Sequence, residues 1–307
     1  MKVFLNEFIH EEALAKLKSF AEVTDNLDEI AEVDAIILRA FPVPRELMEK
    51  AHNLKVIAKH GVGYNTIDIE AAKELNKRVI YTPTANTNSV AELILALMMD
   101  ISRNITTADR QVRENQIERI APIHLTGLEI TGKTLGLIGM GNIARRVAEM
   151  AKGGFGVNVI GYDPYTSGDE AKSFGITKLD TVAEVLKRSD IVNISVPLTE
   201  ETKNLIAGDV FNYFKKNAIL INAARGGIVN EEDLYNHLVN GTLRAAACDA
   251  FEIEPPTTAN KLVGLDNFVA TPHIGANTEE ALYRMGMETV DGIYKELNGG
   301  QANYRVV

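Results

Sequence analysis

Three loops in the second half of the chain carry residue types that together support redox chemistry between an alcohol and a carbonyl. Each loop follows an apolar, β-branched run that we expect to form a strand, and the residues are Arg225, Glu254 and His273. A guanidinium can bind a carboxylate, a histidine can move the alcohol proton, and an acid can stabilise the protonated imidazole. Each residue also has an ordinary interpretation, as half of a surface ion pair, a solvated loop acid or a hydrogen-bonded turn residue.

A dinucleotide motif precedes these loops in the chain. Residues Gly139–Ala144 read G-x-G-x-x-A between the apolar run Thr134–Ile138 and the helical pattern Asn142–Ala151. The first glycine permits a tight turn, the second lets the backbone approach a pyrophosphate, and the small third residue lets the helix pack on the strand. The next run ends at Asp163, whose carboxylate can accept hydrogen bonds from ribose hydroxyls and would repel a 2′-phosphate. No basic residue follows in Pro164–Ser167, so NAD is favoured over NADP; the alternative is that the glycines serve only the turn.

A second glycine motif has the wrong context for nucleotide binding. Residues Gly127–Thr134 fit the spacing G-x4-G-K-[ST] of a phosphate-binding loop. Such a loop follows a strand and opens a helix, whereas Lys133 and Thr134 lead into an apolar strand. We therefore expect a turn at the entry to that strand.

Composition excludes several other classes of protein. The 307 residues carry 32 Lys plus Arg against 42 Asp plus Glu, a net charge of −10, which argues against a nucleic acid or an anionic membrane as the main partner. The single cysteine, Cys248, cannot form an internal disulfide, and the histidines show no metal-ligand spacing, so we predict no metal site. The chain opens without an apolar signal core, and we expect a cytoplasmic protein.

The elements that must position these residues alternate between strand and helix along the whole chain, which is typical of an α/β fold with parallel sheets covered by helices. The expected strands are Lys2–Leu5, Asp34–Leu38, Lys55–Ala58 and Arg78–Tyr81 in one set, and Thr134–Ile138, Asn158–Tyr162, Asp190–Val196, Ala218–Asn222, Leu243–Asp249 and Asn267–Ala270 in the other. Between the sets, Val90–Ile101 predicts a helix that is apolar around most of its circumference. It is either a core helix or a helix at a contact between domains or subunits. The stretch 110–131 is polar and irregular.

At these motifs the chain resembles the D-isomer-specific 2-hydroxyacid dehydrogenases over essentially its whole length. The residues that carry the resemblance are Leu38–Arg39, Gly61–Asn65, Asn86–Glu92, Gly136–Gly141, Asn222–Gly227, Glu254–Pro256 and Pro272–Ala276. In that family the Arg, Glu and His of the last three motifs form the catalytic set, which corresponds here to Arg225, Glu254 and His273.

The resemblance also implies an NAD site and a substrate site. The implied cofactor residues are Gly139, Gly141, Asn142, Ile143, Asp163, Val196, Pro197, Thr202, Ala223, Ala224, Arg225, Asp249, His273 and Gly275. The implied substrate residues, for a small anionic 2-hydroxyacid or 2-oxoacid, are Arg39, Gly61, Val62, Gly63, Asn86, Arg225 and His273.

The same resemblance implies two Rossmann-like domains with parallel sheets. An NAD-binding domain of residues 99–280 is inserted into a flavodoxin-like substrate domain made of residues 1–98 and 281–307. It also implies a homodimer, with Val90–Ile101 and neighbouring segments near the subunit contact.

Within the family, the branch most similar to this chain is that of the D-3-phosphoglycerate dehydrogenases, on Gly161–Pro164, Ala223–Val229 and Thr271–Ala281. One departure is the pair Lys59-His60, which replaces the Arg-Ala common in that branch. These two side chains either add positive charge for a substrate phosphate or lie at the rim of the site. The chain ends shortly after its last helix, so a regulatory amino-acid-binding domain is not expected.

Other functions stay open from the sequence. The nearest is a sister enzyme that reduces hydroxypyruvate, glyoxylate or another 2-oxoacid. An NAD-dependent formate dehydrogenase would have glutamine in place of Glu254. A more distant alternative is a non-enzymatic NAD-sensing protein, and neither the direction of the reaction nor the substrate side chain follows from the motifs.

Overall fold

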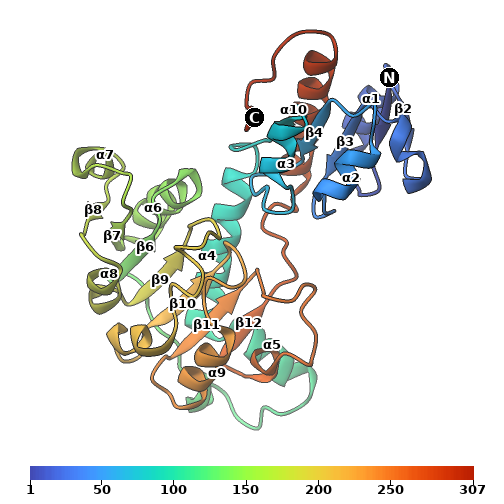
Figure 1. Ribbon diagram of the computed structural model, residues 1–307. Coiled ribbons are helices and arrows are strands. Elements are labelled where there is room, and N and C mark those ends of the chain that lie inside the picture. The colour runs from blue at the N-terminus through green and yellow to red at the C-terminus, as the bar shows by residue number, and fades with distance from the viewer. The chain divides into compact units, whose positions relative to one another are not determined.

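The computed structural model describes residues 1–307, which divide into two compact units (Figure 1). Unit 1 consists of Met1–Ser89 and Ala276–Val307, and unit 2 of Val90–Gly275. The sequence places the boundaries at 98/99 and 280/281, inside the helices that the structure forms at Thr87–Arg103 (α4) and Glu279–Leu297 (α10). The structure instead assigns nearly all of α4 to unit 2, because the apolar residues of this helix pack into the unit 2 core.

Unit 1 contains a five-stranded sheet in the order β2-β1-β3-β4-β5, with every neighbouring pair parallel. This is the order of flavodoxin-like sheets. Its strands are β1 (Lys2–Phe4), β2 (Glu22–Thr24), β3 (Ala35–Leu38), β4 (Val56–Lys59) and β5 (Arg78–Ile80). Its helices are α1 (Glu11–Lys18), η1 (Leu27–Glu32), α2 (Arg45–Lys50), α3 (Ile69–Glu74) and α10. The sequence missed β2, because this three-residue edge strand has no apolar run and is only partly buried.

Both faces of the unit 1 sheet are covered. Along β3, Ile36 and Leu38 enter a core with Met48 of α2, whereas Ile37 enters a second core with Val290 of α10. Side chains on a strand alternate between faces, so a strand buried on both faces reads as one continuous apolar run. This explains why the sequence pattern located β3 and β4 well.

Unit 2 contains a seven-stranded parallel sheet in the order β12-β11-β10-β9-β6-β7-β8. Its strands are β6 (Thr134–Ile138), β7 (Asn158–Tyr162), β8 (Thr177–Lys178), β9 (Ile191–Ile194), β10 (Ile219–Asn222), β11 (Ala245–Cys248) and β12 (Phe268–Ala270). Its helices are α4, α5 (Ile105–Arg113), η2 (Ile123–Leu125), α6 (Asn142–Phe155), α7 (Gly168–Ser173), α8 (Val182–Arg188), η3 (Gly208–Tyr213), α9 (Glu231–Val239) and η4 (Lys261–Gly264). The strand order reverses between β6 and β9, and such a switch point is where open α/β sheets bind ligands.

Helix α4 is part of the unit 2 core. Its residues Ile94, Met98 and Ile101 are at most 2% exposed and share a cluster with Leu135 of β6 and Ile221 of β10. The buried apolar side of this helix therefore belongs to the core of unit 2, whereas Leu93, Leu95 and Met99 are only partly buried.

Two local expectations have clear outcomes. The segment expected to be irregular from residue 110 still belongs to α5 as far as Arg113, and only the part beyond it lacks long elements. The glycine motif at Gly127–Thr134 forms a turn ahead of β6, in which Gly132 has φ +74° and Lys133 donates its N–H to the carbonyl of Ile130. None of the helices combines the length and the apolar character needed to cross a bilayer.

Candidate active site

The residues of unit 2 that the sequence selected for chemistry follow the carboxyl ends of its strands. The glycine turn follows β6, Arg225 follows β10, Glu254 lies beyond β11, and His273 follows β12. Because all seven strands are parallel, these loops emerge at one edge of the sheet (Figure 1).

His273 and Glu254 form a hydrogen-bonded pair. The imidazole Nδ1 lies 2.9 Å from Oε2 and 3.0 Å from Oε1 of Glu254. The side chains are 44% and 37% exposed, so the pair faces open space. With Nδ1 turned to the carboxylate, Nε2 is the nitrogen left to exchange a proton with a substrate.

The carboxylate of Glu254 is stabilised in its ionised form. Partial burial raises its pKa, but the hydrogen bond and charge of His273, the N–H of Phe251 and the charge of Arg225 outweigh burial and hold the pKa below its usual range. An ionised carboxylate at this position accepts a hydrogen bond from the imidazole and so orients the ring.

Arg225 lies on a loop that a buried asparagine holds in shape. Asn222, which is 2% exposed, accepts the N–H of Ala224 at 3.1 Å and donates to the carbonyl of Arg225 at 2.9 Å. Burial lowers the pKa of the guanidinium, while the charge of Glu254 acts in the opposite direction. The residue stays charged at any physiological pH and can bind a carboxylate through two parallel hydrogen bonds.

Gly226 permits the closest contact between the loops of Arg225 and Glu254. A Cβ atom at this position would lie 2.0 Å from the carbonyl carbon and oxygen of Phe251. Since Phe251 also donates its N–H to the Glu254 carboxylate, the absence of a side chain at Gly226 sets the spacing between two of the three candidate catalytic residues. The sequence contains the glycine, but only the structure gives this reason for it.

Asp249 fixes the loop that carries His273. Its carboxylate is 2% exposed and accepts the hydroxyl of Thr271 at 2.6 Å and the N–H groups of Ile274 and Gly275, each at 2.8 Å. The family resemblance implies that Asp249 contacts the cofactor. In the structure both of its oxygens are engaged by residues on either side of His273, which has a left-handed φ of +57°.

The glycine turn fits a pyrophosphate. Gly139 has φ +90°, and a Cβ there would lie 2.4 Å from the carbonyl oxygen of Ser195, so the turn needs a glycine on both counts. Gly141 is the N-cap of α6, no side chain caps this end, and no atom lies within 4 Å of the place a Cβ would occupy. An open helix N-terminus offers unpaired N–H groups and a positive dipole to phosphate oxygens. Asn142 and Ile143 open this helix.

Asp163 is the residue that the sequence predicts to contact the adenosine ribose. It follows β7, and its oxygens accept the N–H groups of Met140 and Tyr165, each at 2.8 Å. A carboxylate has about four acceptor positions, so two stay open for ribose hydroxyls. The contact with Met140 also ties the acid to the glycine turn.

The remaining predicted cofactor residues lie on the loops after β9 and β10 and in the loop of His273. Thr202 shapes the first of these loops: its hydroxyl donates to the carbonyl of Pro197 at 2.6 Å and accepts the N–H of Thr199 at 2.8 Å. Val196 is half-buried beside it. The others are Ala223, Ala224 and Gly275.

In unit 1, the predicted substrate residues occupy the loops that follow β3, β4 and β5. Glu7 accepts the N–H of Arg39 at 2.6 Å and so anchors the first loop. Gly61, with φ +137°, donates its N–H to Thr82 at 2.9 Å ahead of Val62 and Gly63. The amide oxygen of Asn86 is buried without a hydrogen-bond partner. An orphaned acceptor of this kind fits a residue that receives a hydrogen bond from a ligand.

Lys59 and His60 do not lie at an exposed rim, because both are buried, at 8% and 3% exposure. The ammonium of Lys59 donates to the carbonyl of Arg39. Burial, together with the charges of Arg39 and Lys59, lowers the pKa of His60 to about 4. His60 is therefore neutral at physiological pH and supplies no charge for a phosphate.

Metal and thiol chemistry have no site in the structure. No group of three or more His, Cys, Asp and Glu side chains could hold a metal ion. Cys248 is buried, and burial raises the pKa of its thiol well above the usual range, which leaves it protonated and unreactive.

Comparison with known proteins identifies the family. The sequence profile of the D-isomer specific 2-hydroxyacid dehydrogenase NAD-binding domain matches residues 95–275. D-3-phosphoglycerate dehydrogenase of Methanocaldococcus jannaschii is 41% identical over 308 residues, which cover 97% of this chain and 58% of that protein. Hydroxypyruvate reductase of Thermotoga maritima is 42% identical over 308 residues, which cover 96% of this chain and 98% of that protein.

A solved structure has the same fold over its whole length. The TT0316 protein from Thermus thermophilus superposes with a TM-score of 0.93 and 32% identity over the whole of both chains. One family accounts for these similarities and for the structural features. Those features are the parallel-sheet fold, the glycine turn that fits a pyrophosphate and the His273–Glu254 pair. The chain belongs to the D-isomer-specific 2-hydroxyacid dehydrogenase family, and residues 95–275 are matched by that family's NAD-binding domain.

Proposed function

We propose that the protein is an NAD-dependent oxidoreductase that interconverts a D-2-hydroxyacid and its 2-oxoacid. The observation that carries the proposal is the His273–Glu254 pair, hydrogen-bonded at 2.9 Å at the carboxyl edge of the unit 2 sheet, with Arg225 on the neighbouring loop. Bound NAD supplies the hydride acceptor, or NADH the donor, and the glycine turn and Asp163 are the proposed residues that hold it.

Each catalytic residue has a proposed role that follows from its chemistry. Nε2 of His273 takes the proton of the substrate alcohol during oxidation and returns it during reduction, a transfer that typically contributes about 10²–10⁴-fold in rate. Glu254 orients the imidazole through the hydrogen bond at Nδ1 and leaves Nε2 toward the substrate. Arg225 binds the substrate carboxylate and polarises the adjacent carbonyl. The proposed remaining substrate contacts are Arg39, Asn86 and the backbone N–H groups of Val62 and Gly63.

For the substrate, we propose 3-phosphoglycerate, with 3-phosphohydroxypyruvate as the product of a step in serine biosynthesis. The support is the 41% identity to the Methanocaldococcus jannaschii phosphoglycerate dehydrogenase and the motifs shared with that branch. Hydroxypyruvate is a second candidate that a specific observation favours. His60 is neutral, and the ammonium of Lys59 is buried and directed to the carbonyl of Arg39, so neither side chain presents an exposed positive charge to a substrate phosphate.

A substrate panel distinguishes these candidates. Purified protein would be assayed through NADH absorbance with 3-phosphoglycerate and NAD, and with hydroxypyruvate, glyoxylate and 3-phosphohydroxypyruvate and NADH. We expect the highest kcat/KM with the phosphorylated pair. A preference for hydroxypyruvate over its phosphate ester would overturn the substrate proposal and keep the reaction class.

The variant His273→Gln tests the reaction class itself. It removes the proton carrier from an exposed position, so folding and NADH binding should be retained while kcat falls by about 10²–10⁴-fold. NADH binding would be followed by the change in fluorescence of NADH itself, because the chain has no tryptophan to serve as an energy donor. Turnover close to that of the wild type would refute the assignment of His273, and absence of activity with every 2-oxoacid in the wild type would favour an NAD-sensing role.

We also propose that the enzyme is a homodimer in the cytoplasm. The segment around α5 and η2 exposes Ile105, Val112, Ile120 and Ile123, an apolar set that a second copy would cover. The one unpaired cysteine, Cys248, is consistent with a reducing compartment. Light scattering coupled to size-exclusion chromatography would test the dimer, and replacing Ile120 and Ile123 by Ser should shift it to monomer.

A further inference from the structure

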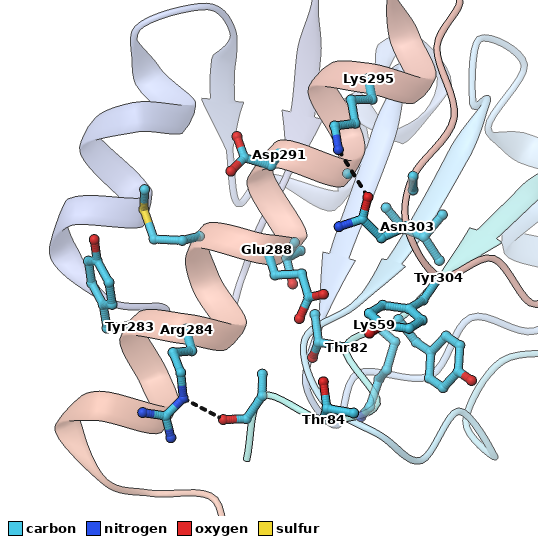
Figure 2. Close-up of a pocket in the computed structure, with 17 residues that line it drawn as sticks. Lys59, Thr82, Thr84, Tyr283, Arg284, Glu288, Asp291, Lys295, Asn303 and Tyr304 are labelled. Atoms are coloured by element: carbon cyan, nitrogen blue, oxygen red, sulfur yellow. Dashed lines mark hydrogen bonds between the residues drawn. The ribbon is translucent and has the colours of Figure 1, made fainter. Parts of the chain in front are cut away.

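Unit 1 contains a cavity that none of the predicted catalytic or substrate residues lines, although Thr82, which accepts the N–H of Gly61, belongs to its wall. It has a volume of about 650 Å³ and lies among α10, the end of β5 and the C-terminal tail (Figure 2). Cavities that bind small molecules in proteins measure roughly 300–1,000 Å³, so this one is large enough for a ligand.

The wall of the cavity that belongs to α10 presents a carboxylate without a partner. Glu288 is half-buried, its carboxylate lies in the middle of the cavity near Thr82 in Figure 2, and it makes no hydrogen bond or ion pair. Burial raises the pKa of Glu288, and the charge of Lys295 only partly offsets this. Beside it, the hydroxyl of Thr289 is buried without a hydrogen-bond partner. Two neighbouring polar groups that lack partners indicate a place for a ligand donor.

Positive charge lies at the ends of the same cavity. Lys295 lies at one end, where its ammonium donates to the side-chain oxygen of Asn303 at 3.1 Å. Lys59 lies at the other end, and Arg284 lines the wall with its Nε bonded to the carbonyl of Ala85 at 2.9 Å. The other lining acid, Asp291, is already paired with Lys16 at 2.5 Å.

This distribution of charge selects the chemical class of the ligand. A simple cation would meet the charges of Lys295, Lys59 and Arg284, and a simple anion would meet the unpaired carboxylate of Glu288. A zwitterion satisfies both. We propose that the cavity binds a small α-amino acid, with the ligand ammonium on Glu288 and Thr289 and the ligand carboxylate on Lys295.

Direct binding to the full chain tests the proposal, without reference to turnover. The proteinogenic L-amino acids would be screened at millimolar concentration by thermal shift, and the tightest binder measured by isothermal titration calorimetry. Its two single-charge analogues, the amine without the carboxylate and the acid without the ammonium, should each bind at least about tenfold more weakly, because each loses one charged hydrogen bond.

Two variants locate the binding site. Glu288→Gln keeps the side chain's size but removes its charge, and it should weaken binding by about tenfold or more. Lys295→Gln should weaken binding in the same way. Because Lys295 is exposed, this variant should fold normally, so it tests the site even if Glu288→Gln is misfolded. The matched control is Glu280→Gln, an exposed glutamate of the same helix outside the cavity, which should leave binding unchanged.

Several outcomes would overturn the proposal. They are the absence of binding by any amino acid, equal binding of a single-charge analogue, and unchanged affinity in both Glu288→Gln and Lys295→Gln. Because the readout is affinity, dehydrogenase activity on any substrate neither supports nor contradicts it.

Discussion

Replacing Gly226 by Ala should sharply lower activity by separating the two loops that carry the proposed catalytic residues Arg225 and Glu254. The backbone φ of Gly226 is not in the left-handed region, so alanine can adopt the conformation and only space opposes it. The added Cβ would lie 2.0 Å from the carbonyl carbon and oxygen of Phe251 and 2.4 Å from the backbone nitrogen of Glu252. These are backbone atoms, which cannot rotate away as a side chain would.

The size of the effect follows from these distances. Carbon atoms in ordinary contact lie about 3.5–4.0 Å apart, so the two loops must separate by roughly 1.5 Å or more. Overpacking of this kind costs about 1–3 kcal/mol in the free energy of unfolding. The separation also displaces Arg225 from Glu254, and a misplacement of about 1 Å in a catalytic constellation can reduce kcat/KM by about 10²-fold.

The assay compares kcat/KM for 2-oxoacid reduction with the melting temperature of the same preparation. The control is Gly154→Ala in α6, where no atom lies within 4 Å of the new Cβ. It should leave kcat/KM unchanged and stabilise the protein by about 0.5–1 kcal/mol, because alanine is the better helix former. If Gly226→Ala retained kcat/KM within a factor of two, the spacing of these loops would not control catalysis.

Three further variants test single contacts. Glu254→Gln removes the charge beside His273 and should lower kcat by about 10–10²-fold with NADH affinity unchanged in a fluorescence titration; equal loss of both would indicate a structural role. Asp163→Ser should raise the kcat/KM ratio for NADP over NAD by about tenfold or more, and an unchanged ratio would mean that Asp163 does not contact the ribose. Asp190 is partly buried, which raises its pKa, but the N–H of Thr134 and the ammonium of Lys215 outweigh this and lower the pKa overall. The stability it contributes is therefore complete above the unfolded-state pKa near 4 and lost as the pH falls through the lower native pKa. Urea unfolding should show Asp190→Asn less stable than the wild type at pH 7, with a gap that narrows at pH 3; an equal gap at both pH values would contradict this.

The sequence located the strands best where both faces of a sheet are covered. The runs predicted for β6 and β7 coincide with the strands observed, since continuous apolar segments are the pattern of doubly buried parallel strands. The sequence missed β2 and β8, which are short edge strands with few apolar residues. The sequence also did not predict the boundary between the units near the start of α4. The first residues of this helix belong to unit 1 and the rest to unit 2, and the hydrophobic pattern of the helix does not change at that point.

Some residues of the candidate site can be recognised from the sequence, and others only from the structure. Charged or titratable residues in loops after apolar runs stand out, and the pairing of His273 with Glu254 agrees with what their types suggested. The roles of Asn222 and Asp249 depend on hydrogen bonds to loop residues, and the spacing of residues in the sequence does not predict these partners. Nor could a pattern have shown that His60 is buried and neutral, since that depends on the residues that surround it in three dimensions.

The arrangement of buried and exposed groups explains how the exposed pair of His273 and Glu254 keeps one geometry. An exposed side chain ordinarily samples several rotamers, and ordering it costs conformational entropy. Here the backbone on either side of His273 is bonded to the buried carboxylate of Asp249, and the loop of Glu254 is packed against Gly226. Folding therefore supplies the ordering before substrate arrives, through contacts that are themselves shielded from water. The imidazole can then remain accessible without losing its alignment, as the proton transfer proposed for His273 requires.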